Sequence, residues 1–174
     1  MEFDRDTLIS WLEEKDATRL ERLYSGAYRT KVSTVGDKVY LRGLVEISNI
    51  CRKNCLYCGI RRDNHAAGRY EISSEEVLQS AEFAYKEGYA SLVIQGGERT
   101  DRAFIDRITS LLKEIKRRWP LGITLSLGEQ PLEVYREWFG AGAHRYLLRI
   151  ESSSRELYEK IHPVDSLHSY DSRV

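Results

Sequence analysis

All three cysteines of the chain lie between residues 51 and 58, in the order Cys51-Arg-Lys-Asn-Cys55-Leu-Tyr-Cys58. Cysteine thiolates are ligands for zinc and for the irons of iron–sulfur clusters. The close spacing suits a loop that wraps around one metal centre. Three thiolates are one too few for a closed tetrahedral zinc site or for a cluster with four protein ligands. The loop therefore predicts a metal centre with one open position, where chemistry can take place.

The elements that position this loop follow from the hydrophobic periodicity of the chain. Apolar runs predict four strands, at 44–48, 91–95, 122–126 and 145–150. Helices are expected to follow, beginning near Ser73, Asp101, Pro131 and Ser153. Four βα units with continuous apolar strands predict a parallel sheet covered by helices, with its strands in sequence order.

The regular alternation favours an α/β fold of the TIM-type (β/α) barrel kind over a doubly wound sheet. An eight-stranded barrel needs about 200 residues or more, and the chain has 174. We therefore expect about the first half of a barrel, four βα units over residues 39–174, as the N-terminal part of a longer protein. A helical, amphipathic segment is expected at residues 1–38, with Asp6 and Asp16 as helix caps.

Parallel sheets bind ligands at the C-terminal ends of their strands. The unusual residues of the chain fall there, in the order cysteine loop, Gly96-Gly97-Glu98, Thr124 with Ser126, and Arg149 with Glu151. Missing glycine side chains let a backbone approach a ligand, and Glu98 can accept a hydrogen bond from an ammonium group. Arg149 and Glu151 share strand parity, so together they suit a zwitterion. A plain tight turn and a surface salt bridge remain as alternatives.

The cysteines themselves have two alternative interpretations. They can be small buried residues, or they can form a zinc site that His65 completes. A structural zinc would, however, fill the mouth of a barrel that otherwise presents a polar site. A cubane 4Fe–4S cluster fits better, because three irons take thiolates and the fourth stays free.

The composition limits the partners and the compartment. Lysine plus arginine number 27, as do aspartate plus glutamate, so the formal net charge is zero. This balance argues against nucleic acid or a membrane as partner, and no apolar run reaches transmembrane length. Tightly clustered cysteines of odd number make a poor disulfide framework. Reduced thiols fit a cytoplasmic protein.

The motif CRKNCLYC resembles the cluster loop of the radical S-adenosylmethionine (SAM) enzymes. Longer stretches, RGLVEISNICRKNCLYCGIRRDN, LVIQGGE, ITLSLGEQP and GAHRYLLRIESSSRELYEKIHP, resemble FeFe-hydrogenase maturases of the HydE type. The likeness runs from about Leu41 to Val174. It favours the HydE type over the related biotin synthases and methylornithine synthases.

The resemblance implies two cofactors, a 4Fe–4S cluster and SAM. It assigns the cluster to Cys51, Cys55 and Cys58, and places Tyr57 beside the SAM adenine. Further contacts to SAM would come from residues near the methionyl amino group, the ribose and the carboxylate, namely Gly96, Gly97, Glu98, Glu151 and Arg173. The small-molecule substrate would face Thr124 and Arg149.

The resemblance also implies a reaction, the reductive cleavage of SAM to methionine and a 5′-deoxyadenosyl radical. In the HydE type this serves the maturation of the FeFe-hydrogenase active-site cluster, with a small iron complex as substrate. Expected partners are an electron donor such as a flavodoxin or ferredoxin, and other hydrogenase maturases. A biotin-synthase-like or methylornithine-synthase-like enzyme, or a non-enzymatic zinc-binding module, stays open. With half a barrel, we expect the chain alone to hold the cluster weakly and to turn over little SAM.

Overall fold

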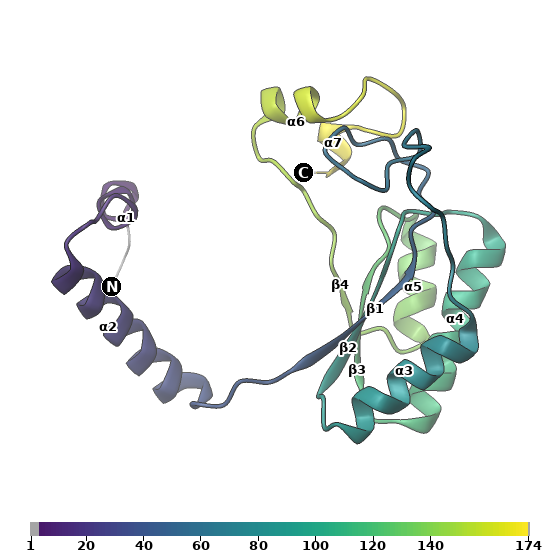
Figure 1. Cartoon of the computed structure of the whole chain (residues 1–174), viewed down its shortest axis with the longest axis horizontal. Helices are drawn as coiled ribbons and strands as arrows, with labels where there is room; N and C mark the ends of the chain where they lie inside the picture. Colours follow the sequence, from purple (N-terminus) through teal and green to yellow (C-terminus); the bar gives the residue numbers. More distant parts are fainter. Residues whose placement is uncertain (1–3, 174) are drawn as a thin grey trace. The chain divides into compact units, whose positions relative to one another are not determined.

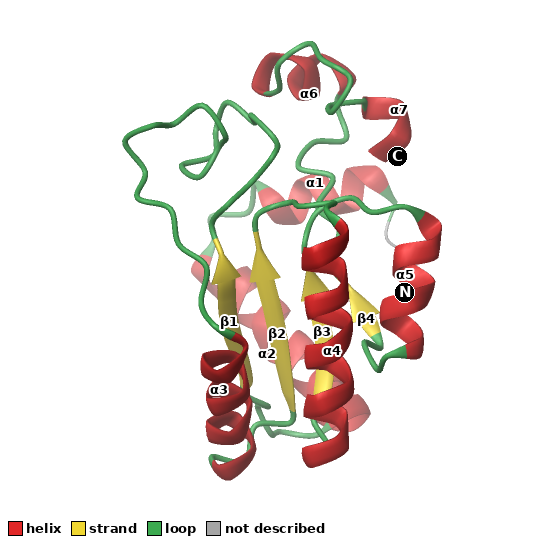
Figure 2. Cartoon of the chain, turned by 90° about the vertical axis from the view of Figure 1, so that its right-hand side faces the viewer, coloured by secondary structure: helices red, strands yellow, loops and turns green. Residues whose placement is uncertain are grey.

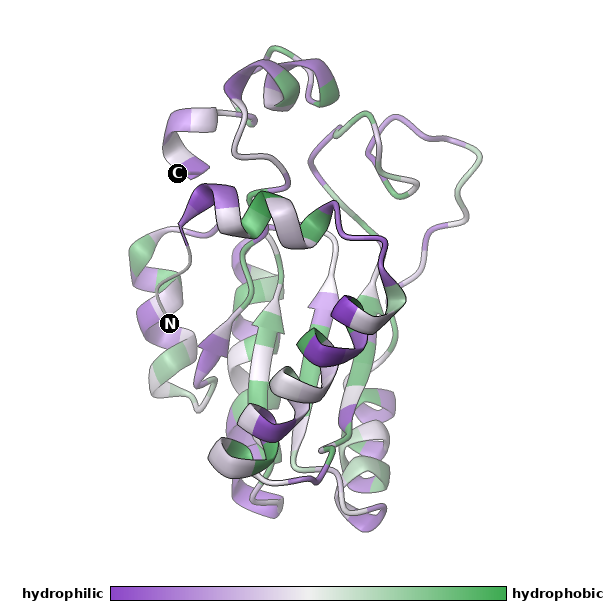
Figure 3. Cartoon of the chain, turned by 90° about the vertical axis from the view of Figure 1, so that its left-hand side faces the viewer, coloured by the Kyte–Doolittle hydropathy of each residue, from purple (hydrophilic) through white to green (hydrophobic). Residues whose placement is uncertain are grey.

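The computed structural model describes residues 4–173, and the chain divides into two compact units, Met1–Val39 and Tyr40–Val174. The first unit contains α1 (Arg5–Leu12) and α2 (Ala17–Val35). Hydrophilic and hydrophobic residues alternate along α2 (Figure 3), and none of its residues is buried. Among residues 4–173, no helix has both the length and the apolar character that crossing a membrane requires.

The two predicted caps of the N-terminal helices have different outcomes. Asp16 caps α2, because its carboxylate accepts from the Arg19 amide at 2.9 Å. The prediction for Asp6 is wrong, since the cap of α1 is Asp4, which accepts from the Thr7 amide at 2.7 Å. Asp6 lies in the first turn of α1, where its negative charge still complements the helix dipole.

The second unit is built on one sheet with strand order β1-β2-β3-β4, and every neighbouring pair is parallel. The strands are β1 (Arg42–Ser48), β2 (Ser91–Gly96), β3 (Gly122–Ser126) and β4 (Arg145–Tyr146). Three helices cover one side of the sheet (Figure 2), namely α3 (Ser74–Lys86), α4 (Arg102–Arg118) and α5 (Leu132–Gly140). The predicted parallel sheet with its covering helices is confirmed.

The hydrophobic core lies between the sheet and these three helices. The strands contribute every second residue to it, namely Val45, Ile47, Leu92, Ile94, Ile123 and Leu125. The helices contribute fully buried side chains such as Ile108 and Leu112 of α4 and Trp138 of α5. Because side chains alternate across a strand, the residues between these, such as Thr124 and Ser126, face the other side of the sheet.

The helix starts follow the signals in the sequence. Ser73 and Glu76 form a complete capping box at the start of α3, and Asp101 accepts from the Phe104 amide at 3.0 Å to cap α4. Pro131 precedes α5 without a side-chain hydrogen bond. Local side-chain capping therefore defines where α3 and α4 begin.

The fourth strand is much shorter than the predicted 145–150. The ladder to β3 ends with the hydrogen bond from the Leu147 amide to the Leu125 carbonyl at 2.8 Å, and the chain then leaves the sheet. A turn follows, with the Ser152 amide donating to the Ile150 carbonyl at 2.8 Å. An edge strand has a pairing partner on one side only, so apolar character is not enough to extend it.

Beyond β4 the chain forms two short helices past the C-terminal ends of the strands (Figure 1), α6 (Arg155–Ile161) and α7 (Tyr170–Arg173). The cap of α6 is Ser154, one residue later than predicted, and α7 was not predicted. The Leu56 amide donates to the Ile161 carbonyl at 2.9 Å, which ties this segment to the cysteine loop.

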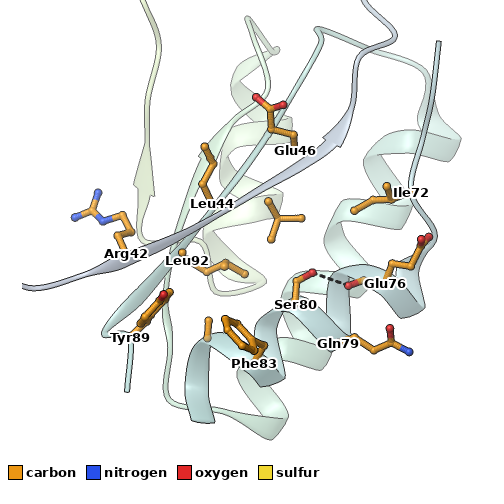
Figure 4. A pocket seen from close by; sticks show the side chains of 13 residues that line it. Arg42, Leu44, Glu46, Ile72, Glu76, Gln79, Ser80, Phe83, Tyr89 and Leu92 are labelled. Atoms are coloured by element: carbon orange, nitrogen blue, oxygen red, sulfur yellow. Dashed lines mark hydrogen bonds between the residues drawn. The ribbon is translucent and has the colours of Figure 1, made fainter. Parts of the chain in front are cut away.

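A cavity of about 820 Å³ forms a groove between β1 and α3 (Figure 4). It runs beside the unpaired edge of β1 and is lined by side chains such as Leu44, Phe83 and Tyr89. Within the described residues no strand pairs with this edge, so the groove reflects the open side of a partial barrel. It lies apart from the cysteines and the strand ends.

Candidate functional site

A smaller cavity of about 190 Å³ lies at the C-terminal ends of the strands, directly at the cysteine loop. Its lining includes every predicted site residue except Thr124, namely Cys51, Cys55, Tyr57, Cys58, Gly96, Gly97, Glu98, Arg149, Glu151 and Arg173. These residues lie after β1, at the end of β2, after β4 and in the C-terminal segment. The topology therefore brings together residues that are up to 122 positions apart in the sequence (173 − 51).

Gly97 allows the cysteine loop to approach the end of β2. A Cβ atom at Gly97 would lie 2.3 Å from the Ile50 carbonyl oxygen and 2.8 Å from the Cys51 Cβ. The next amide, that of Glu98, donates to the Cys51 Sγ at 3.3 Å. Hydrogen bonds to cysteine sulfur are a means by which proteins tune iron–sulfur clusters. The glycine was expected to allow a ligand to approach, but in the structure the group that approaches Gly97 is the backbone of the cysteine loop.

The cysteine loop is held by hydrogen bonds to its own backbone. The Arg62 amide donates to the Lys53 carbonyl at 2.8 Å, and the Cys58 amide donates to the Cys55 carbonyl at 3.0 Å. The guanidinium of Arg69 donates to the carbonyls of Asn49 and Ile60 at 2.9 and 2.8 Å. Because these carbonyls lie on both sides of the cysteines, Arg69 closes the loop at its base.

Cys55 is the cysteine whose surroundings change its chemistry most clearly. Burial raises the pKa of the Cys55 thiol, an effect that the Tyr57 side chain partly opposes. The Cys55 Sγ lies 3.5 Å from the Nε2 of His168, whose Nδ1 lies 2.7 Å from an Asp165 carboxylate oxygen. The sequence analysis missed both Asp165 and His168, because nothing in their local pattern distinguishes them from surface loop residues.

Tyr57 stands at the rim of the cavity, with half of its surface exposed. Burial of its hydroxyl and the nearby Cys55 and Glu151 raise its pKa, so it stays a neutral phenol. Its ring meets the ring of His162 edge-on at 5.4 Å between centroids, and its hydroxyl lies 3.4 Å from the His162 Nε2. Burial lowers the pKa of His162. An exposed, neutral aromatic ring beside the thiols can stack against a planar ligand.

A buried network of charges fills the floor of the site. Glu98 is 4 % exposed, and its carboxylate accepts from the Glu129 amide at 2.8 Å and from the Arg52 guanidinium at 3.1 Å. Lys53 donates to the Glu129 carboxylate, which also accepts from Arg173. Burial alone would raise the pKa of Glu129, but the hydrogen bonds from Lys53 and Arg173 outweigh it and lower that pKa. In this arrangement Glu98 and Arg173 are already paired within the protein.

Arg149 and Glu151 both line the cavity, but the reason is not the predicted strand parity, because β4 ends at Tyr146. The Arg149 carbonyl accepts from the Arg173 guanidinium, and Glu151 has a positive φ of 63°. A left-handed backbone is uncommon for a residue with a side chain and is often found at functional sites. The turn after β4, rather than a strand, therefore orients the side chains of Arg149 and Glu151.

Thr124 lies outside the cavity. It precedes Ser126, a lining residue, by two positions on the same face of β3, and it is buried. Its hydroxyl oxygen has no hydrogen-bond partner within the described residues. A buried hydroxyl without a partner is unusual, so Thr124 keeps hydrogen-bonding capacity on the face of the sheet that the covering helices leave open.

The donor set is compatible with an iron–sulfur cluster that takes three thiolates. All three cysteines are free, and they line one cavity beside glycine backbone and an amide that donates to sulfur. Across residues 4–173, no three histidine, cysteine, aspartate or glutamate side chains converge on a position where they could hold one metal ion. The alternative of a zinc site completed by the exposed His65 therefore has no assembled ligand set in this structure.

The Radical SAM superfamily matches residues 45–170. The FeFe hydrogenase maturase subunit HydE of Thermotoga maritima is 42% identical over 169 residues, which are 97% of this chain and 48% of that protein. The biotin synthase of Magnetococcus marinus is 33% identical over 156 residues, covering 87% and 47%.

Among solved structures, that of methylornithine synthase (PylB) matches with a TM-score of 0.87 at 24% identity, covering 99% of this chain and 50% of that one. At this identity the match supports the fold alone, and it agrees with the partial barrel described above. The chain spans about half the length of the curated relatives it matches.

Proposed function

The chain belongs to the radical SAM superfamily, and we propose that it provides the cluster-binding and SAM-binding half of a HydE-type maturase. The observation that carries the proposal is the position of the three free cysteines. They follow β1 at the C-terminal end of a parallel sheet and line one cavity with Gly96, Gly97 and the rim tyrosine Tyr57. A metal centre bound there would face the strand ends that in such sheets carry the ligand.

In this proposal Cys51, Cys55 and Cys58 hold a 4Fe–4S cluster. When bound, the cluster supplies the electron that cleaves SAM to methionine and a 5′-deoxyadenosyl radical. The residues of the chain orient the cofactors. The Glu98 amide donates to the Cys51 sulfur, the ring of Tyr57 offers a face for the adenine, and Glu151 reaches the ribose or amino region from the turn after β4.

The methionyl end of SAM carries an ammonium and a carboxylate, for which the site provides both signs of charge. Arg173 lines the cavity and is proposed to bind the carboxylate, and Glu98 with the Gly96-Gly97 backbone is proposed to meet the ammonium. In the structure Arg173 is paired with Glu129, and Glu98 is paired with Arg52. SAM would either share Arg173 and Glu98 with these partners or replace the partners. Arg149 and Thr124 remain the proposed contacts to the substrate.

The assignment to hydrogenase maturation rests on the HydE relative, which is more similar to this chain than the biotin synthase, at 42% against 33% identity. We propose that the full protein acts on a small iron complex and receives electrons from a flavodoxin or ferredoxin. The alternative within the same superfamily is an enzyme of the biotin synthase or methylornithine synthase kind. The accumulation of an inactive FeFe hydrogenase after deletion of the gene would favour the maturase, and an auxotrophy for biotin would contradict it.

The experiment that tests the cofactor proposal is anaerobic reconstitution of the purified chain with iron, sulfide and, separately, zinc. We expect iron and sulfide to bind in about a one-to-one ratio, with the brown absorption of a 4Fe–4S cluster. The triple variant with Cys51, Cys55 and Cys58 changed to alanine should lose this absorption. Uptake of zinc in preference to iron, or iron uptake that does not depend on the cysteines, would contradict the proposal.

A further inference from the structure

We propose that Lys53 is the positioning residue of the cysteine loop, a buried cation that locks the loop onto the ends of β2 and β3. Lys53 lies midway between Cys51 and Cys55 in the sequence. It is 3 % exposed, whereas lysine is among the residues least often buried. Its burial therefore needs a structural reason.

The reason is given by the acceptors around its ammonium group. Lys53 Nζ donates to the Glu129 carboxylate and to the Leu167 carbonyl, and it lies 3.7 Å from the Glu98 carboxylate. An ammonium has three N–H groups, and here it faces three oxygens from three different segments. Two of these N–H groups are used in hydrogen bonds, to Glu129 and Leu167, and the contact to Glu98 is a longer ionic one.

These three acceptors lie on the segments that build the site. Glu98 follows β2, Glu129 follows β3, and Leu167 belongs to the segment between α6 and α7. A buried charge is tolerated only while it is paired, because its desolvation is otherwise uncompensated. The loop cannot shift away from the strand ends without separating Lys53 from all three oxygens at once.

The same contacts place a second functional side chain. Glu129 accepts from both Lys53 and Arg173, so Lys53 fixes the carboxylate that in turn holds Arg173 at the cavity. One lysine thus sets the position of the cysteines on one side of the cavity and of Arg173 on the other. The inference rests on the proposed function only for the identity of the metal; the positioning itself is a property of the chain without metal.

The test is hydrogen–deuterium exchange of the metal-free chain, comparing the wild type with Lys53→Met. We expect the amides of residues 51–58 to exchange at least about tenfold faster in the variant, because the loop loses the buried ammonium that joins it to Glu98, Glu129 and Leu167 and opens locally. The amides of β2, residues 91–96, should keep their wild-type protection. Their simultaneous loss would overturn the inference, since Lys53 would then support the whole fold and not the loop.

Two further variants separate positioning from a general effect of charge. Lys86→Met removes the lysine of an exposed pair with Glu82, at 2.6 Å, and should change exchange at 51–58 by less than about twofold. Glu129→Gln should give a smaller increase than Lys53→Met, and the double variant should give less than the sum of the two single effects, because the two residues share one contact. Equal effects of Lys53→Met and Lys86→Met, or additive effects at Lys53 and Glu129, would overturn the inference.

A second readout links the loop to the metal. After reconstitution, Lys53→Met should retain iron about tenfold more weakly than the wild type, the usual range for residues that support metal ligands. If the wild type takes up no cluster, the proposed function fails, while the exchange experiment still decides the role of Lys53. If iron retention is unchanged although the loop amides exchange faster, Lys53 does not position the ligands and the inference is overturned.

Discussion

Two regions of the second unit are stabilised in different ways: the layer between the sheet and its helices, and the C-terminal ends of the strands. Between the sheet and helices α3, α4 and α5, side chains such as Ile108, Leu112 and Ile123 are completely buried and apolar. At the C-terminal ends of the strands, the buried residues Lys53 and Glu98 are charged and depend on each other and on their neighbours. The first region is stabilised by the removal of apolar area from water, the second by paired charges.

The difference explains how the fold can carry a reactive site. Apolar packing is non-directional and keeps the sheet rigid whatever occurs at its rim. A paired charge network is directional, and it loses stability sharply when one partner is removed. The rim can therefore position ligands closely without determining the fold, and variants in the two regions should differ in kind.

The largest effect is expected in the apolar region. Leu112 of α4 is fully buried in the core, so Leu112→Ala should lower the free energy of unfolding by about 2–5 kcal/mol. Leu132→Ala, at a leucine of α5 that is 60% exposed, is the matched control and should change it by less than about 0.5 kcal/mol. Denaturant unfolding followed by circular dichroism measures both. Equal losses would mean that the covering helices do not form the core described here.

The next effect concerns the contact between the cysteine loop and the end of β2. Gly97→Ala places a Cβ 2.3 Å from the Ile50 carbonyl oxygen, which should cost about 1–3 kcal/mol of stability and displace the cysteine loop. Iron retained after reconstitution should fall together with the melting temperature. Gly59→Ala, in the same loop, meets no atom within 4 Å of the added Cβ and should leave both unchanged. A Gly97→Ala chain with wild-type stability would show that the loop is not packed against β2.

A smaller effect is expected at the start of α3. Ser73→Ala removes the capping box, in which the Ser73 hydroxyl accepts from the Glu76 amide at 3.2 Å. The loss should be about 1 kcal/mol of unfolding free energy, without any change in iron retention. Ser80→Ala, in the interior of the same helix, is the comparison for removing a serine hydroxyl away from the cap. A loss of iron binding in Ser73→Ala would mean that the scaffold and the site are not separable.

The smallest expected effect is a dependence of stability on pH, caused by the charged residues at the strand ends. The pKa of the Glu129 carboxyl is lower in the folded chain than its ordinary value near 4.5. The ionised carboxylate therefore stabilises the fold fully above about pH 4.5, and this stabilisation is lost as the pH falls through the folded-state pKa. The melting temperature of the wild type should therefore fall on acidification below about pH 4.5, and less so in Glu129→Gln.

The matched control for this pH series is Glu133→Gln, at an exposed glutamate of α5. It should lose stability in acid as the wild type does. If Glu129→Gln and the wild type showed the same acid-side decline, the Lys53–Glu129–Arg173 contacts would not contribute to stability.

The elements of the apolar region could be predicted because the signals that define them lie within short stretches of sequence. Alternating burial along β1, β2 and β3 and the caps at Ser73 and Asp101 are visible in short windows of sequence. The extent of β4 was not predictable, because residues 147–150 are mostly apolar, like a strand, but within residues 4–173 no strand pairs with their outer side. Whether a segment forms a strand depends on the strands beside it as well as on its own residues.

The grouping of the proposed site residues could be predicted from the sequence, and their contacts only partly. The cysteine spacing and the order of strand ends brought Cys51, Gly97 and Glu151 to one cavity. Lys53 and His168 were missed because a buried lysine and a loop histidine have no local signature; their partners Glu129 and Cys55 are 76 and 113 positions away. Buried polar contacts between distant segments appear only once the fold is known.

The most direct test of the central claim is electron paramagnetic resonance of the reconstituted, reduced chain with and without SAM. We expect the signal of a reduced 4Fe–4S cluster, a change in that signal when SAM is added, and the loss of both when Cys51, Cys55 and Cys58 are replaced by alanine. A cluster signal that SAM leaves unchanged, or a signal that survives without the cysteines, would contradict the assignment of this cavity as the SAM site.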